Sequence, residues 1–182
     1  MVPPQAEFTS ISSITPEALG EPGKRTFRLL VEDAAGSAMI WMEKEQLFQL
    51  AMAITRLQAI LPASGKDDPE APSGEAEGSG PHFEFTVGKI VLGHEGTSDR
   101  FVIDAYDAGL EEGEDSEETG PTIRLWGVRG QLRTFATEAL KVCAAGRPIC
   151  PLCSEPMDSD GHKCARVNGH DVRPLTQEDQ DV

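Results

Sequence analysis

The sequence has little basic charge, few aromatic residues and no long apolar run. Among 182 residues, 16 Lys and Arg face 31 Asp and Glu, the formal net charge is −15, and 5% are aromatic. Such a charge repels nucleic acid phosphates and anionic membrane surfaces unless a local basic face overrides it. No stretch approaches the roughly 20 apolar residues that cross a bilayer, and the N-terminus lacks the basic and apolar regions of a secretory signal. We therefore expect a cytoplasmic protein without a membrane partner.

Most of the negative charge lies in three short segments. Residues 62–81 carry −4, residues 107–120 carry −7 and residues 171–182 carry −3. Because they are poor in large apolar side chains, ordering their backbone at about 1 to 2 kcal/mol per residue brings little burial in return. We expect two mobile acidic segments and a disordered acidic tail. These segments either solubilise the protein or dock a partner, and the rest of the chain is close to neutral.

Strand-like patterns followed by a helix-like pattern occur twice along the chain. Residues 26–32 and 37–42 are rich in β-forming side chains and predict a hairpin. Apolar residues three and four positions apart then predict a helix over 43–61, which Pro62 ends. The second stretch predicts strands over 83–92, 100–106 and 122–126, a turn over 93–99 and a helix over 129–145. His94 lies in that turn and is expected to face solvent.

The two stretches align with an offset of 85 residues. Trp41 then matches Trp126 and Gln46 matches Gln131, and the chain has no other tryptophan. The alignment predicts an α+β fold with pseudo-twofold character: two β-then-α units, in which antiparallel hairpin strands pack on two helices. The alternative is a chance likeness between two amphipathic strand-helix junctions. Because each tryptophan ends a strand just before a helix, we expect both to anchor the core.

Three of the four cysteines lie in one short C-terminal stretch, and in a reducing compartment this clustering favours a metal over disulfides. Cys150 and Cys153 form a Cys-x-x-Cys pair, which brings two thiolates to a metal from one tight turn. His162 and Cys164 can complete the coordination. Three thiolates and an imidazole favour Zn²⁺ in a closed structural site. The fourth ligand stays open, because an Asn-Gly turn makes His170 an alternative.

These patterns predict an α+β domain over residues 1–146, a zinc-ribbon-like knuckle over 147–170 and the acidic tail over 171–182. A redox Cys-x-x-Cys normally opens a helix, whereas residues 154–156 do not continue one. A third possibility is a set of loop cysteines that bind no metal. Cys143 stands apart on an apolar helix face, and we expect it to be a buried thiol.

A Pro-Gly loop at residues 20–26 is a second candidate site. It is not a phosphate-binding Walker A loop, because it leads into a strand rather than a helix. The simpler interpretation is a turn that opens the first hairpin. The alternative is an anion-binding site formed by Lys24 and Arg25 of this loop together with Arg147 beside the cysteines.

Three motifs carry a resemblance to a known family: the loop at 20–27, the Glu-Lys-Glu-Gln run at 43–46, and the run at 145–170. The last contains Cys-Pro-x-Cys and Gly-His-x-Cys-x-Arg-x-Asn-Gly. Together they resemble an uncharacterised bacterial family, found mainly in actinobacteria, that is known as domain of unknown function 3090. The resemblance covers about residues 7–170 and implies a cytoplasmic protein of this size, without a known activity or cofactor. His170 stands where the family more usually has an aromatic residue.

We therefore expect a non-enzymatic zinc-binding protein that acts as a protein-interaction or scaffold module. The first alternative is a binder of a small anionic ligand, or an enzyme, with its site near the 20–26 loop and the zinc knuckle. The second is a zinc ribbon that binds nucleic acid. No residue is assigned a catalytic role.

Overall fold

The computed structural model describes residues 3–21, 23–34, 36–61, 80–110, 120–145, 150–153, 162–167 and 170–172. The acidic segments and the tail expected from the sequence lie mostly outside these described residues. The chain divides into two compact units. The first, Met1–Leu19 with Thr26–Cys143, is called the sheet unit below, and the second, Gly20–Arg25 with Ala144–Val182, the cysteine unit.

The sheet unit combines one large sheet with two helices, which confirms the expected α+β class. In chain order its elements are β1 (Ala6–Phe8), β2 (Ser13–Leu19), β3 (Thr26–Asp33), β4 (Gly36–Met42), α1 (Lys44–Ile60), β5 (His82–Glu95), β6 (Arg100–Asp107), a 3-10 helix (Ala108–Leu110), β7 (Ile123–Val128) and α2 (Arg129–Ala144). The strands are ordered β1-β7-β6-β5-β4-β3-β2. β1 pairs with β7 and β4 with β5 in parallel, and the other neighbours are antiparallel.

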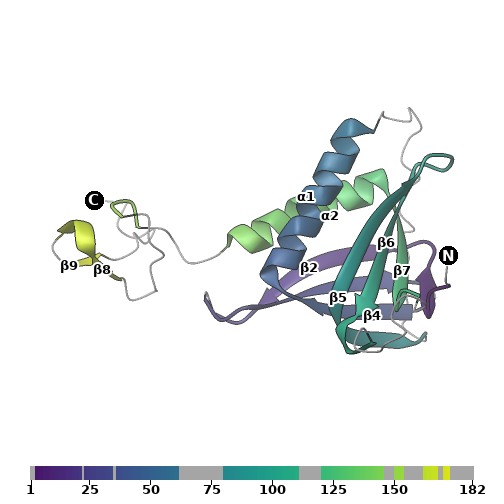
Figure 1. Ribbon diagram of the computed structural model, residues 1–182, viewed down its shortest axis with the longest axis horizontal. Helices are drawn as coiled ribbons and strands as arrows, with labels where there is room; N and C mark the ends of the chain where they lie inside the picture. The colour runs from purple at the N-terminus through teal and green to yellow at the C-terminus, as the bar shows by residue number, and fades with distance from the viewer. Residues whose placement is uncertain are drawn as a thin grey trace. The chain divides into compact units, whose positions relative to one another are not determined.

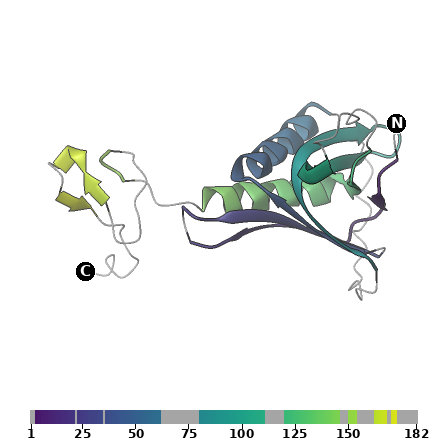
Figure 2. The same cartoon turned by 60° about the horizontal axis from the view of Figure 1, so that its bottom comes forward.

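The sheet is strongly curved because its two edge strands are consecutive in the chain. β1 and β2 lie at opposite edges of seven strands. A flat sheet of that size would be about 29 Å wide at 4.8 Å per strand. The five Cα steps from Phe8 to Ser13 span at most about 18 Å, so the sheet has to curl until its edges approach. Figure 2 shows this curvature, with both helices on the same side of the sheet.

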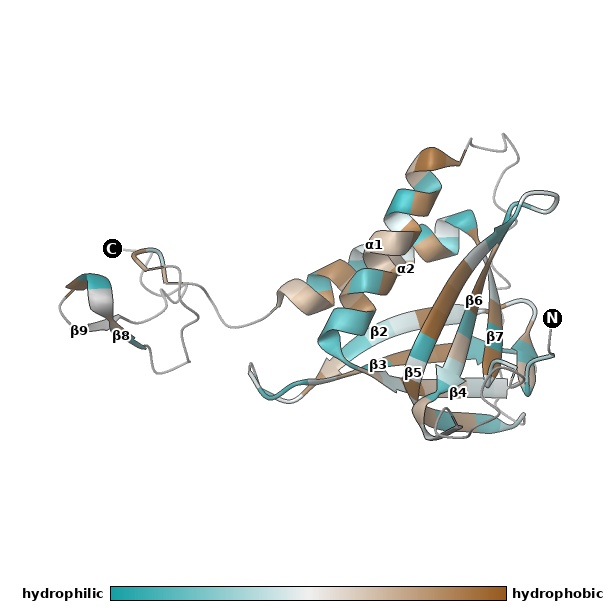
Figure 3. Ribbon diagram, viewed as in Figure 1, coloured by the Kyte–Doolittle hydropathy of each residue, from teal (hydrophilic) through white to brown (hydrophobic). Residues whose placement is uncertain are grey.

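The core lies between the inner face of the sheet and the two helices (Figure 1). Strands β3, β4 and β7 alternate strictly between buried and partly exposed residues, as strands with one covered face do. In Figure 3, brown and teal segments follow one another along β7. The largest fully buried side chains include Phe8, Leu29, Ile40, Leu47, Ile54, Phe101, Ile123, Leu125, Leu132 and Phe135.

The two halves of the sheet unit repeat each other more closely than the offset of 85 suggests. Three antiparallel strands, β2-β3-β4, precede α1, and three antiparallel strands, β5-β6-β7, precede α2. Phe85 pairs with Ile40 in the parallel contact of β5 with β4, and Phe8 pairs with Leu125 in that of β1 with β7. Both phenylalanines stand in an identical Glu-Phe-Thr tripeptide. β1 and β2 together therefore correspond to the single long strand β5, with an offset of 77 for β1 and 76 for β2.

A matched glutamine at the start of each helix joins that helix to the sheet. The Gln46 carbonyl accepts the backbone N–H of Glu43 at 2.8 Å, and its amide donates to the backbone carbonyls of Val87 and Gly88 at 3.2 and 3.3 Å. Gln131 repeats this arrangement. It accepts from Val128 at 3.1 Å and donates to Ile11 at 2.7 Å. Each glutamine thus accepts an N–H at the start of its helix that has no partner within the helix. It also holds α1 against β5, or α2 against the connection between β1 and β2.

The expectation that both tryptophans anchor the core is wrong. Trp41 and Trp126 are partly exposed, each next to a buried strand residue and therefore on the opposite face of the sheet. Their indole N–H groups donate to carboxylates, from Trp41 to Glu84 at 2.9 Å and from Trp126 to Glu7 at 2.7 Å. The two acids are the first residues of the repeated Glu-Phe-Thr tripeptides, so the pairing follows the internal repeat.

Several boundaries differ from the sequence expectation. β1 and β2 were not expected, and the strand expected over 83–92 continues to Glu95, which shortens the turn that follows. Asp107, expected in the second mobile segment, ends β6. Its N–H donates to Thr122 Oγ1 and its carboxylate accepts the N–H of Gly109, both at 2.9 Å. The loop between β2 and β3 is a turn, as expected, with positive φ at Gly20 and Gly23.

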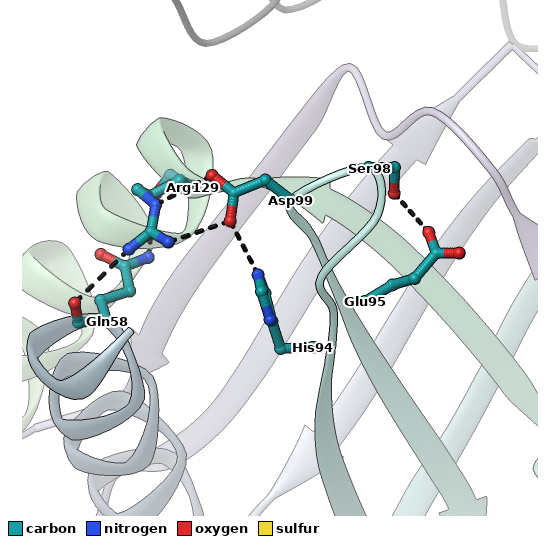
Figure 4. A network of polar contacts seen from close by, with 6 residues as sticks. All are labelled: Gln58, His94, Glu95, Ser98, Asp99 and Arg129. Carbon is teal, nitrogen blue, oxygen red and sulfur yellow. Dashed lines mark hydrogen bonds and ion pairs between the residues drawn. The ribbon is translucent and has the colours of Figure 1, made fainter. Parts of the chain in front are cut away.

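A buried ion pair ties the β5–β6 turn to both helices (Figure 4). Asp99 accepts from Arg129 Nη2 at 2.9 Å and from His94 Nε2 at 2.7 Å. Arg129, at the start of α2, also donates to the Gln58 backbone carbonyl in α1 at 3.4 Å, and the Gln58 amide donates to the Arg129 carbonyl at 2.9 Å. His94 is therefore held inside this network instead of facing solvent, because β5 continues past it and its ring packs on Phe101, with ring centres 4.8 Å apart.

Replacing Asp99 by Asn is expected to destabilise the sheet unit by about 3 kcal/mol, because it removes the carboxylate that pairs with the Arg129 guanidinium, which is 7% exposed. Asn tolerates the left-handed backbone of Asp99, φ 52°, so that the change tests the ion pair and not the turn. Thermal unfolding should show a fall of about 10 °C. Glu138→Gln, which removes the exposed pair with Lys141, is the control and should change stability by less than about 1 kcal/mol. Equal effects of the two changes would contradict the role given to Asp99.

Candidate metal centre

The cysteine unit brings the Cys-x-x-Cys turn against a small hairpin. Cys150 to Cys153 form the turn, β8 is His162–Cys164 and β9 is His170–Val172, with a 3-10 helix at Ala165–Val167 between the two strands. β8 and β9 are antiparallel, and Lys163 lies opposite Asp171. Asp171 and Val172, expected in the disordered tail, thus belong to a strand.

Four potential ligands meet in this unit. The sulfur atoms of Cys150, Cys153 and Cys164 and a ring nitrogen of His162 all lie within 4.8 Å of one another. The Cys150 and Cys164 sulfurs are 3.9 Å apart, and the Cys153 sulfur is 3.6 Å from His162 Nε2. Two ligands thus come from the turn and two from β8. Alternate residues of a strand point to the same face, so His162 and Cys164 reach the cluster from one short strand.

These separations fit a tetrahedral ion. Zinc with bonds of about 2.3 Å to sulfur and about 2.0 Å to nitrogen holds two sulfurs about 3.8 Å apart, and a sulfur and a nitrogen about 3.5 Å apart. The contacts of 3.9 and 3.6 Å agree with both values. None of the four cysteines of the chain forms a disulfide. The donors are arranged as ligands of a metal and not as a covalent crosslink.

The turn itself favours a thiolate at Cys150. Burial raises the pKa of the Cys150 thiol, but hydrogen bonds from the backbone N–H groups of Cys153 and Leu152 and from the His162 and Cys153 side chains outweigh it and lower the pKa to about 6. The thiolate is the form that binds metal. The tight Cys-x-x-Cys geometry therefore presents both a pair of sulfurs and the backbone donors that stabilise their charge.

Almost nothing except the ligands is buried in the described part of this unit. Its apolar cluster consists of Cys150 and Cys164, both 0% exposed, with Cys153 and Val167 packed against them. Such a cluster removes too little apolar surface from water to offset the entropy of ordering the chain. Ligation of a metal ion by these four residues would be strong enough to match that cost.

The other sequence candidates are placed less completely. The side chain of His170, the alternative fourth ligand, and all of Arg147 fall outside the described residues. Lys24 is exposed, and the Arg25 guanidinium donates to the backbone carbonyl of Ala145. The 20–25 loop does belong to the same compact unit as the four ligands, and this grouping of segments far apart in the chain was not evident from their sequence separation.

Cys143 is separate from the cluster and buried, as expected. It lies on α2 with 5% exposure, and its thiol donates to the Lys44 backbone carbonyl at 3.8 Å. Burial raises the pKa of this thiol, Lys44 lowers it to a smaller extent, and Glu45 raises it further. A buried, protonated thiol is a poor nucleophile.

The chain belongs to a family of proteins of unknown function, DUF3090, whose model matches residues 6–164. This span includes every strand and helix of the sheet unit and all four ligands. It confirms the resemblance noted from the motifs. No curated protein and no solved structure matches the chain. Of the helices that the structure describes, none combines the length and the apolar character needed to cross a membrane.

The thiols are expected to fall into two classes. In zinc-loaded protein none of the four should react quickly with a thiol reagent, because three are ligands and Cys143 is buried. A chelator should release three reactive thiols, and the fourth should appear only on unfolding of the sheet unit. Colorimetric titration of thiols before and after chelation measures this. Rapid reaction of three thiols before chelation, in protein purified with zinc, would contradict the assignment of the ligands.

Proposed function

We propose that this protein is a non-enzymatic zinc-binding protein, in which a structural Zn²⁺ ion holds the cysteine unit in shape as a site for a protein partner. The observation that carries the proposal is the convergence of Cys150, Cys153, His162 and Cys164 within 4.8 Å. Three thiolates and one imidazole leave no coordination position for a substrate or a water molecule, which is typical of structural rather than catalytic zinc.

The surface around the ligands supports a role in binding. Leu152, at the tip of the Cys-x-x-Cys turn, is 48% exposed, and Lys163 and Arg166 are exposed beside Cys164 in the chain. An apolar tip with basic neighbours suits a partner that offers an apolar pocket with acidic side chains around it. Zinc would position these side chains by fixing the turn and β8 that carry them.

Metal analysis of the purified protein tests the zinc site. We expect one zinc per chain, and its loss when Cys150 and Cys153 are both replaced by Ser. The matched control is Cys143→Ala, which removes the one cysteine outside the cluster and should retain the full zinc content. A folded wild-type protein that takes up no zinc would refute the proposal, as would equal zinc loss in the control.

Removing zinc should unfold the cysteine unit and leave the sheet unit intact. The sheet unit has a large apolar core, whereas the apolar cluster described in the cysteine unit consists of the ligands and Val167. Hydrogen exchange with and without a chelator should show lost protection in residues 150–172, and unchanged protection in α1 and α2. Retained protection of residues 150–172 after complete removal of the metal would show that the zinc is not structural.

The binding role has its own test. The change Leu152→Ser, which leaves all four ligands in place, should keep one zinc per chain but weaken binding of a partner that the wild-type protein retains. Simultaneous charge reversal at Lys163 and Arg166 should do the same. Loss of zinc in these variants would show that the side chains support the metal site instead of a partner.

A further inference from the structure

One edge of β5 has no partner strand over most of its length in the part of the chain that the structure describes. β4 pairs with β5 only from His82 to Thr86. From Val87 to Glu95, β5 pairs with β6 on its other side, and no pairing with β4 continues. A free strand edge presents unpaired backbone N–H and C=O groups, to which another strand can add.

This free edge is apolar and lies beside a groove. Ile90, Val91 and Leu92 follow one another along it, and Val91 is 42% exposed. The middle of β5 accordingly appears brown in Figure 3. A cavity of about 410 Å³ separates the edge from α1. It is lined by Glu45, Gln46, Gln49, Leu50, Ala53, Gly88, Ile90 and Leu92.

The equivalent edge in the first half of the repeat is blocked. β2 corresponds to this part of β5, and a similar groove of about 440 Å³ separates it from α2. At the position equivalent to Leu92 of β5, β2 carries Pro16, since Pro16 pairs with Leu29 as Leu92 pairs with Ile103. Proline has no N–H to donate and protects strand edges from addition. β5 has no proline from Gly88 to Glu95. The edge of β2 is therefore protected by a proline, and the corresponding edge of β5 is not.

We propose that this edge binds the same edge of a second copy of the chain, with the two β5 strands antiparallel about a twofold axis at Leu92. In this register Lys89 of each copy lies opposite Glu95 of the other, so that opposite charges pair at both ends of the contact. Val91 lies opposite Gly93, which sets a larger side chain against the smallest residue. Leu92 lies opposite its own copy, on the side of the groove.

Charge complementarity along the strand favours a second copy over an unrelated peptide. Lys89 and Glu95 stand the same number of residues from Leu92, and both face away from the helices, on the face that also carries Val91. An antiparallel copy of the same strand matches both charges at once. The apolar residues between the two charges would be removed from water in the contact.

Light scattering coupled to gel filtration tests the proposal on the full-length, zinc-loaded chain. The wild type is expected to have twice the 19.6 kDa of one chain. Lys89→Glu and Glu95→Lys should each raise the dissociation constant of the dimer about tenfold, since like charges then face each other twice. The double variant restores opposite charges and should recover the dimer. Lys141→Glu, on the exposed face of α2, is the control.

A cysteine at the twofold axis tests the register independently. Residues opposite each other in antiparallel strands have Cα atoms about 4.5 to 5.5 Å apart, within the range that a disulfide spans. Leu92→Cys should therefore form a covalent dimer on mild oxidation, whereas Ile60→Cys, 77% exposed at the end of α1, should not.

Three results would overturn the proposal. The first is a wild type that stays monomeric up to about 100 µM, a concentration at which even a weak dimer forms. The second is a dimer that neither charge reversal weakens, and the third is a double variant no better than the single ones. Circular dichroism of each variant excludes misfolding as the cause of a lost dimer. The zinc content is unaffected in all these outcomes, so the test is separate from that of the zinc site.

Discussion

The passage of the chain from one edge of the sheet to the other within a few residues is the constraint on which the sheet unit depends. Because β1 and β2 belong to opposite edges, the seven strands curl, and the inner face becomes a concave surface that two helices cover. In the internal repeat, β1 and β2 correspond to the two ends of β5, but the chain between them passes from one edge of the sheet to the other. Each half then leaves a strand edge facing a helix across a groove.

The polar contacts of the sheet unit follow this geometry. Gln46 joins the start of α1 to β5, and Gln131 joins the start of α2 to the connection between β1 and β2. The tryptophans near the ends of β4 and β7 each donate to the glutamate of a repeated Glu-Phe-Thr tripeptide. Asp99 has no equivalent in the first half. It links the β5–β6 turn to Arg129, and through Arg129 to the end of α1. The repeat is thus symmetric in its sheet and asymmetric in its connections.

The cysteine unit depends on a different interaction. Cys150 and Cys164 are buried although the described unit has almost no other core, so that the proposed metal ligation would replace apolar burial as the source of order. Family membership covers both units but assigns neither a function. The proposals assign zinc and a partner surface to the cysteine unit, and self-association to the free edge of β5.

Where sequence patterns failed, the cause was identifiable. β1 and β2 were missed because β1 has only three residues and β2 contains Pro16, which weakens its strand pattern. The position of each tryptophan before a helix suggests a place in the core, but the alternation of its strand directs the side chain to the opposite face. Ile40 and Leu125 are buried, so their neighbours Trp41 and Trp126 must face the other way. The correspondence of β1 and β2 to β5 is hidden in the sequence. Loops of unequal length make the offset there differ from the offset of 85 at the strand-helix junctions.

The sequence by itself determined most of the strands and both helices, the α+β class and the cysteine and histidine candidates for a metal site. These depend on periodicity and ligand spacing within short segments, which are local properties of the chain. Only the tertiary structure decided which strands are neighbours, that His94 and Arg129 share Asp99, and that no strand of the described residues covers one edge of β5. Those outcomes join residues far apart in the chain, and they follow from how a curved sheet packs against two helices, which no single segment encodes.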